Sequence, residues 1–355
     1  MKAKVVFTRP AYWGKCESEK LDLHYVSLSG IHTTILRNKK VCGDSVGGVL
    51  TKNGELNLEA KFEKVKPDVF LWWATYSFDG TELKLGTVLK TLKRLKSIAP
   101  KCKFLYGNGN QQGVPDFNME AFKPLIDGVL INTRDKREVA MYKQWGTKHV
   151  HTLHTFGFDP KKHGPAIFGT EVPKYDCFFG GSQTCDIKRG KPVAFYPQSK
   201  MLNGKYMKSK MRLDFLTEVD KRFNLLVRGK GKWPFPVAPY LHGEDYPMGF
   251  GQTKIALGMY HWDLERYYTK RTIYSGASGR LLITHYIPGM EKDFTNGKNI
   301  VWFRTPEEGI EKIAFYLAHD NERELIAAAQ REHFIKNHSW EPRLREFEKV
   351  VEKIL

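Results

Sequence analysis

Cysteine and long apolar segments are both scarce in this chain. Its 355 residues hold five scattered cysteines that form neither a C-x-x-C pair nor a metal-binding spacing: Cys16, Cys42, Cys102, Cys177 and Cys185. We therefore expect reduced thiols. The longest apolar run, residues 69–74, is far shorter than the roughly 20 residues needed to span a bilayer. The first residues are too briefly apolar for a signal peptide. These absences predict a cytoplasmic protein that does not enter a membrane.

Acidic residues are also in deficit. Asp and Glu number 39 against 57 Lys and Arg, which gives a net charge of +18. An excess of this size creates a field that draws polyanions to the surface. We therefore consider that the substrate or partner of this protein is a polyanion. The alternative is a basic balance that serves only solubility.

The length exceeds that of one hydrophobic core and predicts two domains. In the first half, short β-branched or aromatic runs alternate with amphipathic stretches, which is the pattern of a parallel sheet covered by helices. Strands are expected at residues 4–8, 68–74, 103–106, 128–131 and 149–153, with a hairpin around 33–50. Helices are expected over residues 85–96 and from an N-cap at Asn132 or Thr133 to Trp145.

Turn residues and charges around residues 158–165 are typical of an interdomain linker. A second alternating set follows, with strands expected at residues 175–179, 224–228, 254–259, 281–284 and 300–303. Helices are expected at residues 306–318 and 322–335, followed by an amphipathic tail. The pattern predicts an α/β fold with domains at 1–165 and 166–335.

Two segments carry candidate chemistry. In the first, a strand of buried character breaks into Gly180, Gly181 and Ser182. Such a turn exposes backbone N–H groups and a hydroxyl to a phosphate, whose charge Lys188 or Arg189 would neutralise. By itself a Gly-Gly turn is more often only a turn. In the second segment, residues 271–284, a short helix stops at a glycine and turns directly into a strand.

The second segment resembles the C-terminal domain of GT-B glycosyltransferases, especially the spore-maturation type. The order of residues 285–308 continues the likeness, and residues 127–132 and 156–160 resemble the end of that family's N-terminal domain. The resemblance covers residues 125–355. It implies two Rossmann-like domains across a cleft, with residues 336–355 as a helix returning to the first domain. It also implies a monomer that needs no metal and uses a nucleotide diphosphate sugar, with a UDP-sugar favoured.

A narrower resemblance is to phage DNA β-glucosyltransferase, which has a similar length, a basic balance and the same strand before Gly-Gly-Ser. It implies a phage-encoded enzyme that acts on double-stranded DNA. Tyr274 stands where relatives carry a ribose-binding Glu, and Asn108 stands near the place of the phage enzyme's catalytic Asp. The two likenesses together give an expected donor site of Gly181, Ser182, Lys188, His242, Glu244, Arg271, Tyr274 and Ser278.

Sugar transfer requires a group that accepts the acceptor's proton, together with stabilisation of the leaving diphosphate. Asp116 ends a loop that follows a predicted strand, where α/β sheets place their ligands, and it is the first candidate base. Asp79 also follows a strand and is the second. Either is equally an ordinary turn residue. If neither acts, a retaining mechanism remains open.

Two further patterns concern metal and nucleic acid. His149, His151 and His154 alternate on a predicted strand, but they have no carboxylate or Cys partner in the sequence, so we interpret them as packing and surface residues. Residues 188–212 contain eight Lys or Arg and no acid, interleaved with aromatics. This stretch is either a solvated insertion or a loop that grips a nucleic-acid backbone. On the second interpretation, the contacts come from Lys191, Lys200, Lys205, Lys208 and Lys210.

The sequence thus supports three hypotheses. The first is a glycosyltransferase that modifies a hydroxymethylated base flipped out of DNA. The second is the same kind of enzyme acting on a cell-surface glycan, a protein or a small molecule. The third is a nucleic-acid-binding protein on a GT-B scaffold that has lost catalysis.

Overall fold

The computed structural model describes residues 2–7, 17–25, 52–72, 85–108, 123–154, 157–168, 172–181, 185–188, 191–194, 209–241, 246–260 and 264–355. Its contacts divide the chain into two compact units. Unit 1 comprises Met1–Asn132, Lys136–Thr155 and Trp340–Leu355, and unit 2 comprises Thr133–Asp135 and Phe156–Ser339. The main divisions fall at Phe156 and Trp340, whereas the sequence placed them at residues 165 and 335.

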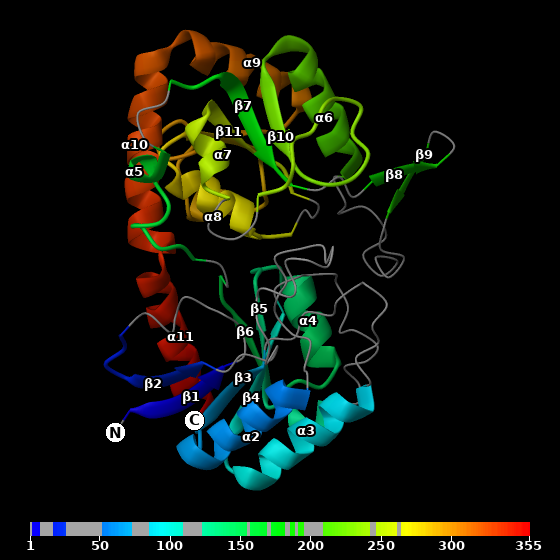
Figure 1. Ribbon diagram of the computed structural model, residues 1–355, viewed down its shortest axis with the longest axis vertical. Coiled ribbons are helices and arrows are strands. Elements are labelled where there is room, and N and C mark those ends of the chain that lie inside the picture. Colours follow the sequence, from blue (N-terminus) through cyan, green and yellow to red (C-terminus); the bar gives the residue numbers. More distant parts are fainter. Residues whose placement is uncertain are drawn as a thin grey trace. The chain divides into compact units, whose positions relative to one another are not determined.

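Unit 1 is built on a parallel six-stranded sheet in the order β2-β1-β3-β4-β5-β6 (Figure 1). The strands are β1 Ala3–Phe7, β2 Leu21–Tyr25, β3 Val69–Trp72, β4 Lys103–Asn108, β5 Gly128–Ile131 and β6 His149–Thr152. The helices are α2 Lys52–Val65, α3 Leu85–Ile98, α4 Lys136–Gln144 and α11 Trp340–Ile354, with a 3-10 turn η3 at Lys123–Leu125.

Side chains that alternate along the strands of the unit 1 sheet pack into two apolar layers, one on each face. Val6 and Phe70 pack with α2, α3 and α4 on one face. Their neighbours Val5 and Leu71 pack with α11 on the other face. Successive strand residues point to opposite faces, so a strand covered on both sides reads as a continuous apolar run. This explains why residues 69–72 are apolar throughout.

Unit 2 repeats the plan with a parallel five-stranded sheet in the order β10-β7-β11-β12-β13. Its strands are β7 Tyr175–Gly180, β10 Leu225–Arg228, β11 Thr253–Gly258, β12 Leu281–His285 and β13 Val301–Phe303, and a separate hairpin pairs β8 Cys185–Lys188 with β9 Lys191–Ala194. The helices are α5 Pro165–Phe168, α6 Ser209–Arg222, α7 Met248–Gly251, α8 Lys270–Ala277, α9 Pro306–Ala318 and α10 Asp320–His338, with a 3-10 turn η6 at Met290–Lys292.

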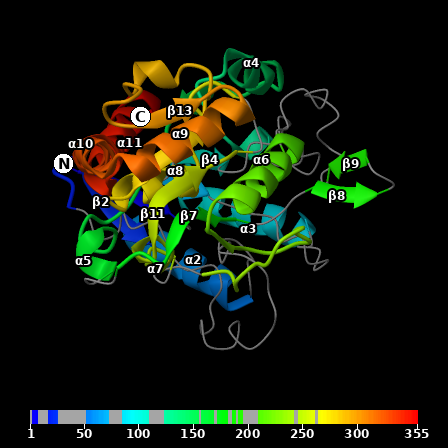
Figure 2. The same ribbon diagram turned by 90° about the horizontal axis from the view of Figure 1, so that it is seen from above.

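Both faces of the unit 2 sheet are covered as well. Phe178 and Leu282 pack with α7, α8 and Phe334 of α10 on one side. Phe179 and Ile283 pack with α6 and α9 on the other. Figure 2 shows α6 and α9 side by side, as their contacts require. Each unit is therefore a three-layer α/β/α sandwich, as the sequence predicted.

Several expected elements differ in detail. The N-cap prediction for α4 was wrong, because the helix begins at Lys136 and Thr133 instead donates its hydroxyl proton to the carbonyl of Glu265. Within residues 188–212, the structure has strand β9 and the start of α6 rather than one continuous loop. Arg212 of α6 is buried, and its guanidinium lies 5.6 Å from the centre of the Phe179 ring. The expected hairpin at residues 33–50 lies outside the described residues.

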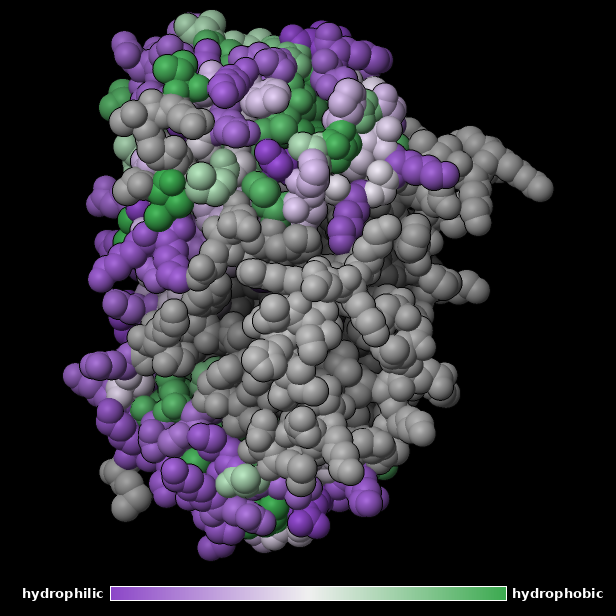
Figure 3. Space-filling view, in the orientation of Figure 1, coloured by the Kyte–Doolittle hydropathy of each residue, from purple (hydrophilic) through white to green (hydrophobic). Residues whose placement is uncertain are grey.

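The described surface agrees with the composition. Over α2 and α3 it is largely hydrophilic, as Figure 3 shows, and Lys64, Lys90 and Lys93 are exposed there. Across the described residues, no helix is both long enough and apolar enough to cross a bilayer. Cys102 and Cys177 are buried free thiols, and burial raises the pKa of Cys102 to about 12.

Candidate donor site

The candidate site begins at the carboxyl edge of the unit 2 sheet. Strands β10 and β7 run parallel and end together, with Arg228 opposite Gly180. Strand β11 ends beside them at Gly258, and β12 ends at His285. Open parallel sheets bind ligands beyond this edge, because backbone groups and loops converge there. The Gly-Gly turn that the sequence singled out lies at the end of β7.

Crowding explains why both residues of this turn are glycines. The hydroxyl of Tyr246 donates a hydrogen bond to Gly180 O over 3.2 Å, and a Cβ on Gly180 would lie 2.8 Å from two ring atoms of that tyrosine. A Cβ on Gly181 would lie 3.0 Å from Cζ of Arg271 and would overlap Nη2. The Gly181 N–H donates to Arg228 O over 2.9 Å. The two glycines therefore let an aromatic ring and a guanidinium approach the backbone.

Arg271 lies in the first turn of α8 and reaches across the ends of two strands. Its Nε donates to Gly180 O, and its Nη1 donates to Met259 O, both over 2.6 Å. Its guanidinium also lies 4.5 Å from the centre of the Phe179 ring. Charge-assisted bonds of this kind are short and fix the orientation of the guanidinium plane. A permanent positive charge is thus anchored at the Gly-Gly turn, and its pairing with a diphosphate stays a prediction.

Tyr274 and Ser278, further along α8, have packing and capping roles in the structure. Tyr274 is 7% exposed, and its ring centre lies 4.4 Å from that of His163 and 5.7 Å from that of Tyr246. The Ser278 hydroxyl donates to Ser275 O over 2.6 Å and accepts from the N–H of Arg280 over 3.1 Å. Ser278 therefore terminates the helix. A donor-binding role for these two residues stays a prediction.

Buried hydroxyl groups support the base of α8. The Tyr260 hydroxyl is hydrogen-bonded to that of Thr272, and Thr284 donates to Gly258 O over 2.7 Å. Burial, as the largest cause, raises the pKa of Tyr260. The phenol is therefore protonated at neutral pH and serves as a fixed hydrogen-bonding group. This cluster connects α8 to the ends of β11 and β12.

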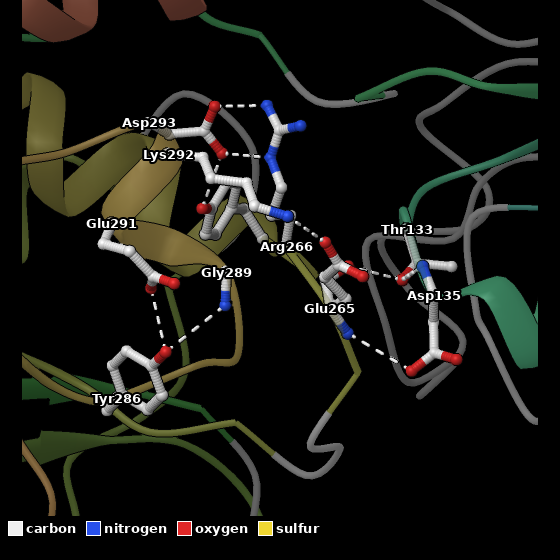
Figure 4. A network of polar contacts seen from close by, with 10 residues as sticks. Thr133, Asp135, Glu265, Arg266, Tyr286, Gly289, Glu291, Lys292 and Asp293 are labelled. Carbon is white, nitrogen blue, oxygen red and sulfur yellow. Dashed lines mark hydrogen bonds and ion pairs between the residues drawn. The ribbon is translucent and has the colours of Figure 1, made fainter.

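The segment that leads into α8 is tied down by the polar network in Figure 4. Glu265 O accepts a hydrogen bond from Thr133 Oγ1 at 2.7 Å. It also accepts one from Arg134 N at 2.9 Å. The Glu265 carboxylate pairs with Lys292 at 2.8 Å. Residues 133–135 therefore belong to unit 2 because their polar groups bind Glu265.

The next residue in the segment, Arg266, lies in the left-handed region with φ of 53°. Its guanidinium forms a two-bond ion pair with Asp293, and the Tyr268 hydroxyl donates to the same carboxylate over 2.8 Å. The hydrogen bonds to Asp293, as the largest cause, raise the pKa of Arg266 above its usual value. Sequence reasoning missed this network, since its members are far apart along the chain. The only local signal was the Arg-Tyr-Tyr run before α8.

Most of the other predicted site residues cannot be placed. Asp79, Asp116, Ser182, His242, Glu244, Lys200, Lys205 and Lys208 lie outside the described residues. For Lys188, Lys191 and Lys210 the structure describes the backbone only, in β8, β9 and α6. Among the predicted donor residues, the structure brings Gly181 and Arg271 into contact.

The three histidines at β6 are not arranged as a metal site. His149 and His151 stack with ring centres 6.1 Å apart, while His154 is buried beyond the end of the strand. Burial, with smaller effects from His149 and Lys353, lowers the pKa of His151. In the part of the chain that the structure describes, no three His, Cys, Asp or Glu side chains are grouped to hold a metal ion.

Part of unit 2 and the end of unit 1 are similar to a known protein family. Residues 210–349 match the model of a family described as glycosyl transferase-like. These residues are those of a glycosyltransferase. The matched segment contains Arg271, Glu265, Arg266 and Asp293. The enzyme class predicted from the sequence is confirmed. A search of curated proteins gives no match.

Solved structures confirm the GT-B fold. An alpha-glucosyltransferase in complex with UDP-glucose and DNA containing an abasic site has a TM-score of 0.62 at 12% identity, covering 99% of each chain. Anabaena HepE in complex with UDP-glucose has a TM-score of 0.56 at 9% identity, covering 98% of this chain and 99% of its own. Sucrose-phosphate synthase from Thermosynechococcus elongatus has a TM-score of 0.55 at 8% identity, covering 100% and 99%.

Proposed function

We propose that this glycosyltransferase uses a UDP-sugar and transfers the sugar to a hydroxymethylated base in double-stranded DNA. The observation that carries the donor half is the anchored Arg271 guanidinium beside Gly181. A fixed cation at the carboxyl edge of a Rossmann-like sheet suits a diphosphate, because it stabilises negative charge without reorganising. The UDP-glucose complexes of HepE and of the alpha-glucosyltransferase support the choice of nucleotide.

The acceptor is proposed from fold and charge together. The alpha-glucosyltransferase whose structure contains DNA is similar to this chain over nearly the whole length of both proteins. The net charge of +18 would favour contact with the phosphate backbone of DNA. A base inside the duplex cannot reach a buried donor, so the target base must be flipped out before transfer.

In the proposed reaction, the hydroxyl oxygen of the hydroxymethyl group forms a bond to the anomeric carbon of the sugar. The bond from that carbon to the diphosphate oxygen breaks, and the electron pair leaves with UDP. Arg271 stabilises the charge that develops on the diphosphate. The hydroxyl proton passes to a base, for which Asp116 is the first candidate and Asp79 the second.

Two assays with purified protein test the proposal. UDP-, GDP- and dTDP-sugars are first compared for thermal stabilisation, and a UDP-sugar is expected to raise the midpoint most. The best donor, carrying a radiolabel, is then incubated with hydroxymethylated DNA, with unmodified DNA of the same sequence, and with glycan acceptors. Label is expected only on the hydroxymethylated DNA. Label on glycans with DNA inert would refute the acceptor. If the protein binds DNA but neither transfers the sugar nor hydrolyses the donor, the proposed enzymatic activity is refuted.

The residue roles are tested separately from the acceptor. Arg271→Met keeps much of the side-chain volume and removes the charge, so it is expected to raise the KM for the donor and to slow transfer. Asp116→Asn and Asp79→Asn remove one candidate base each and keep the size of the side chain. If Asp116 is the base, its variant loses transfer while UDP-sugar binding is unchanged. Wild-type transfer by both variants would exclude both carboxylates.

A further inference from the structure

The loop that follows β10 emerges at the same sheet edge as the Gly-Gly turn. It spans Gly229 to Val237 and is closed at its base by two backbone hydrogen bonds. The N–H of Gly229 donates to Ala238 O over 3.3 Å, and the N–H of Ala238 donates to Val227 O over 2.9 Å. Arg228, immediately before the loop, accepts the N–H of Gly181 over 2.9 Å. The loop therefore begins next to the candidate donor site.

Aromatic packing holds this loop in place. The Trp233 ring lies 6.0 Å from Phe179 and 5.4 Å from Phe235, between ring centres, and Phe235 is buried. The indole N–H of Trp233 donates to Lys230 O over 3.2 Å. Prolines at positions 234 and 236 fix two backbone φ angles. Phe179, which contacts Trp233, also contacts the Arg271 guanidinium. One buried ring thus positions both the loop and the arginine.

The tip of the loop, residues 229–232, reads Gly-Lys-Gly-Lys, and we call it the lysine tip. Gly231 has φ of 101°, a conformation that side chains rarely adopt. Lys232 is exposed and Lys230 is half-buried. Within the described residues neither lysine forms an ion pair, whereas Lys221, Lys292 and Lys312 of the same unit each pair with a carboxylate. The lysine tip is therefore held by the packed aromatic residues that follow it and includes a glycine with positive φ. It carries two positive charges that no described carboxylate neutralises.

We propose that the lysine tip is a second phosphate-binding element, which acts beside Arg271 at the carboxyl edge of unit 2. Lysine ammonium groups bind phosphate as point charges, and a loop already fixed by packing loses little conformational entropy when it binds. The phosphate comes either from the donor's diphosphate or from the backbone of the acceptor DNA. This inference rests on the proposed function, because both sources are substrates of that reaction.

The chain supplies a matched control for the test. Lys298 also follows a glycine with positive φ, Gly297 at 74°, and is exposed. It precedes β13, so it lies at the amino edge of the same sheet, away from the carboxyl ends of the strands. Lys298→Ala removes one positive charge from the local context that Lys232 has, an exposed lysine after a glycine with positive φ. An effect specific to the lysine tip must therefore be absent from this variant.

The experiment compares the full-length wild type, Lys230→Ala/Lys232→Ala and Lys298→Ala. Affinity for UDP and for UDP-glucose is measured by calorimetry, and affinity for a DNA duplex is measured across a salt series. If the lysine tip contacts the donor, the double variant should lose about tenfold in affinity for the UDP ligands, which equals about 1.4 kcal/mol. Its DNA binding should then be unchanged. A DNA contact predicts weaker duplex binding, and the slope of log affinity against log salt falls by up to about 1.8 for two lysines.

Thermal unfolding of the double variant should match the wild type, because the packing of Trp233 and Phe235 is unchanged. If the double variant misfolds, Lys232→Gln alone is used, since this side chain is exposed. If the affinity for every ligand changes by less than twofold, as in Lys298→Ala, the phosphate-binding role of the lysine tip is refuted and the proposed function is unaffected. A wild type that binds neither UDP ligands nor DNA would overturn both.

Discussion

Replacing each glycine of the Gly-Gly turn by alanine should separate folding from donor binding. Neither glycine has positive φ among the described backbone angles, so the substitutions introduce no backbone strain. Each new methyl group instead meets neighbouring side chains. In Gly180→Ala it meets the ring of Tyr246, and in Gly181→Ala it meets the guanidinium of Arg271 and lies 3.2 Å from Cε1 of Phe179.

The two neighbours differ in how far they can move. Tyr246 is 6% exposed and packs on Phe178 and Phe250, so its ring cannot retreat from a methyl group 2.8 Å away. Overpacking of this kind typically costs about 1–3 kcal/mol of stability. Arg271 Cζ, 3.0 Å from the new methyl group, must withdraw by about 0.4 Å to reach ordinary contact at 3.4 Å, and Nη2 must withdraw further. That movement weakens the bonds to Gly180 O and Met259 O.

Gly180→Ala is therefore expected to lower the free energy of unfolding by about 2 kcal/mol. Gly181→Ala is expected to lower it by about 1 kcal/mol and to weaken UDP-glucose binding by about tenfold. Chemical denaturation measures the first quantity, and calorimetry of UDP-glucose measures the second. Wild-type donor affinity in Gly181→Ala would refute the placement of the diphosphate beside Arg271.

Three further predictions concern the surroundings of the site. Ser278→Ala should cost about 1 kcal/mol of stability, because it removes the helix-terminal hydroxyl; calorimetry of UDP-glucose with the same variant tests the predicted donor role, which an unchanged affinity would exclude. Asp293→Asn should cost about 2 kcal/mol in chemical denaturation, because Arg266 and Tyr268 lose their shared carboxylate, and an unchanged midpoint would contradict the network. Burial, as the largest cause, lowers the pKa of His163, so the unfolded state binds more protons and stability should fall as pH drops from 8 through the ordinary value of 6.5. His163→Gln should flatten this pH dependence, and a slope identical to that of the wild type would show that His163 does not cause it.

The sequence predicted the buried strands best, because their signal is continuous. Strand β5 was predicted with its observed bounds, Gly128–Ile131, as an apolar run between turn residues. Strand β2 was missed, since Asp22 and His24 interrupt its apolar residues and it lies at the edge of the sheet. Helix α6 was missed because its first turn lies in the basic stretch, where Lys210 and Arg212 were interpreted as surface charges.

The candidate site was predictable only where chemistry is local in the sequence. Gly181 follows a strand and Arg271 begins a helix, and both patterns are visible in a few residues. The contacts that orient Arg271 come from Gly180 and Met259, and those that fix the preceding segment come from Thr133 and Asp293. These groups are brought together only by the fold. No local pattern of spacing or periodicity reports them.

The proposed reaction moves a sugar from a UDP-sugar onto a hydroxymethylated base in DNA. The most direct measurement is the mass of a hydroxymethylated duplex before and after incubation with the protein and UDP-glucose. We expect the modified duplex to gain the mass of one hexose per modified base. An unmodified duplex of the same sequence should not change, and the increase should be much slower with Arg271→Met. An unchanged mass for the modified duplex, while the same protein transfers the sugar to a glycan, would contradict the proposed reaction.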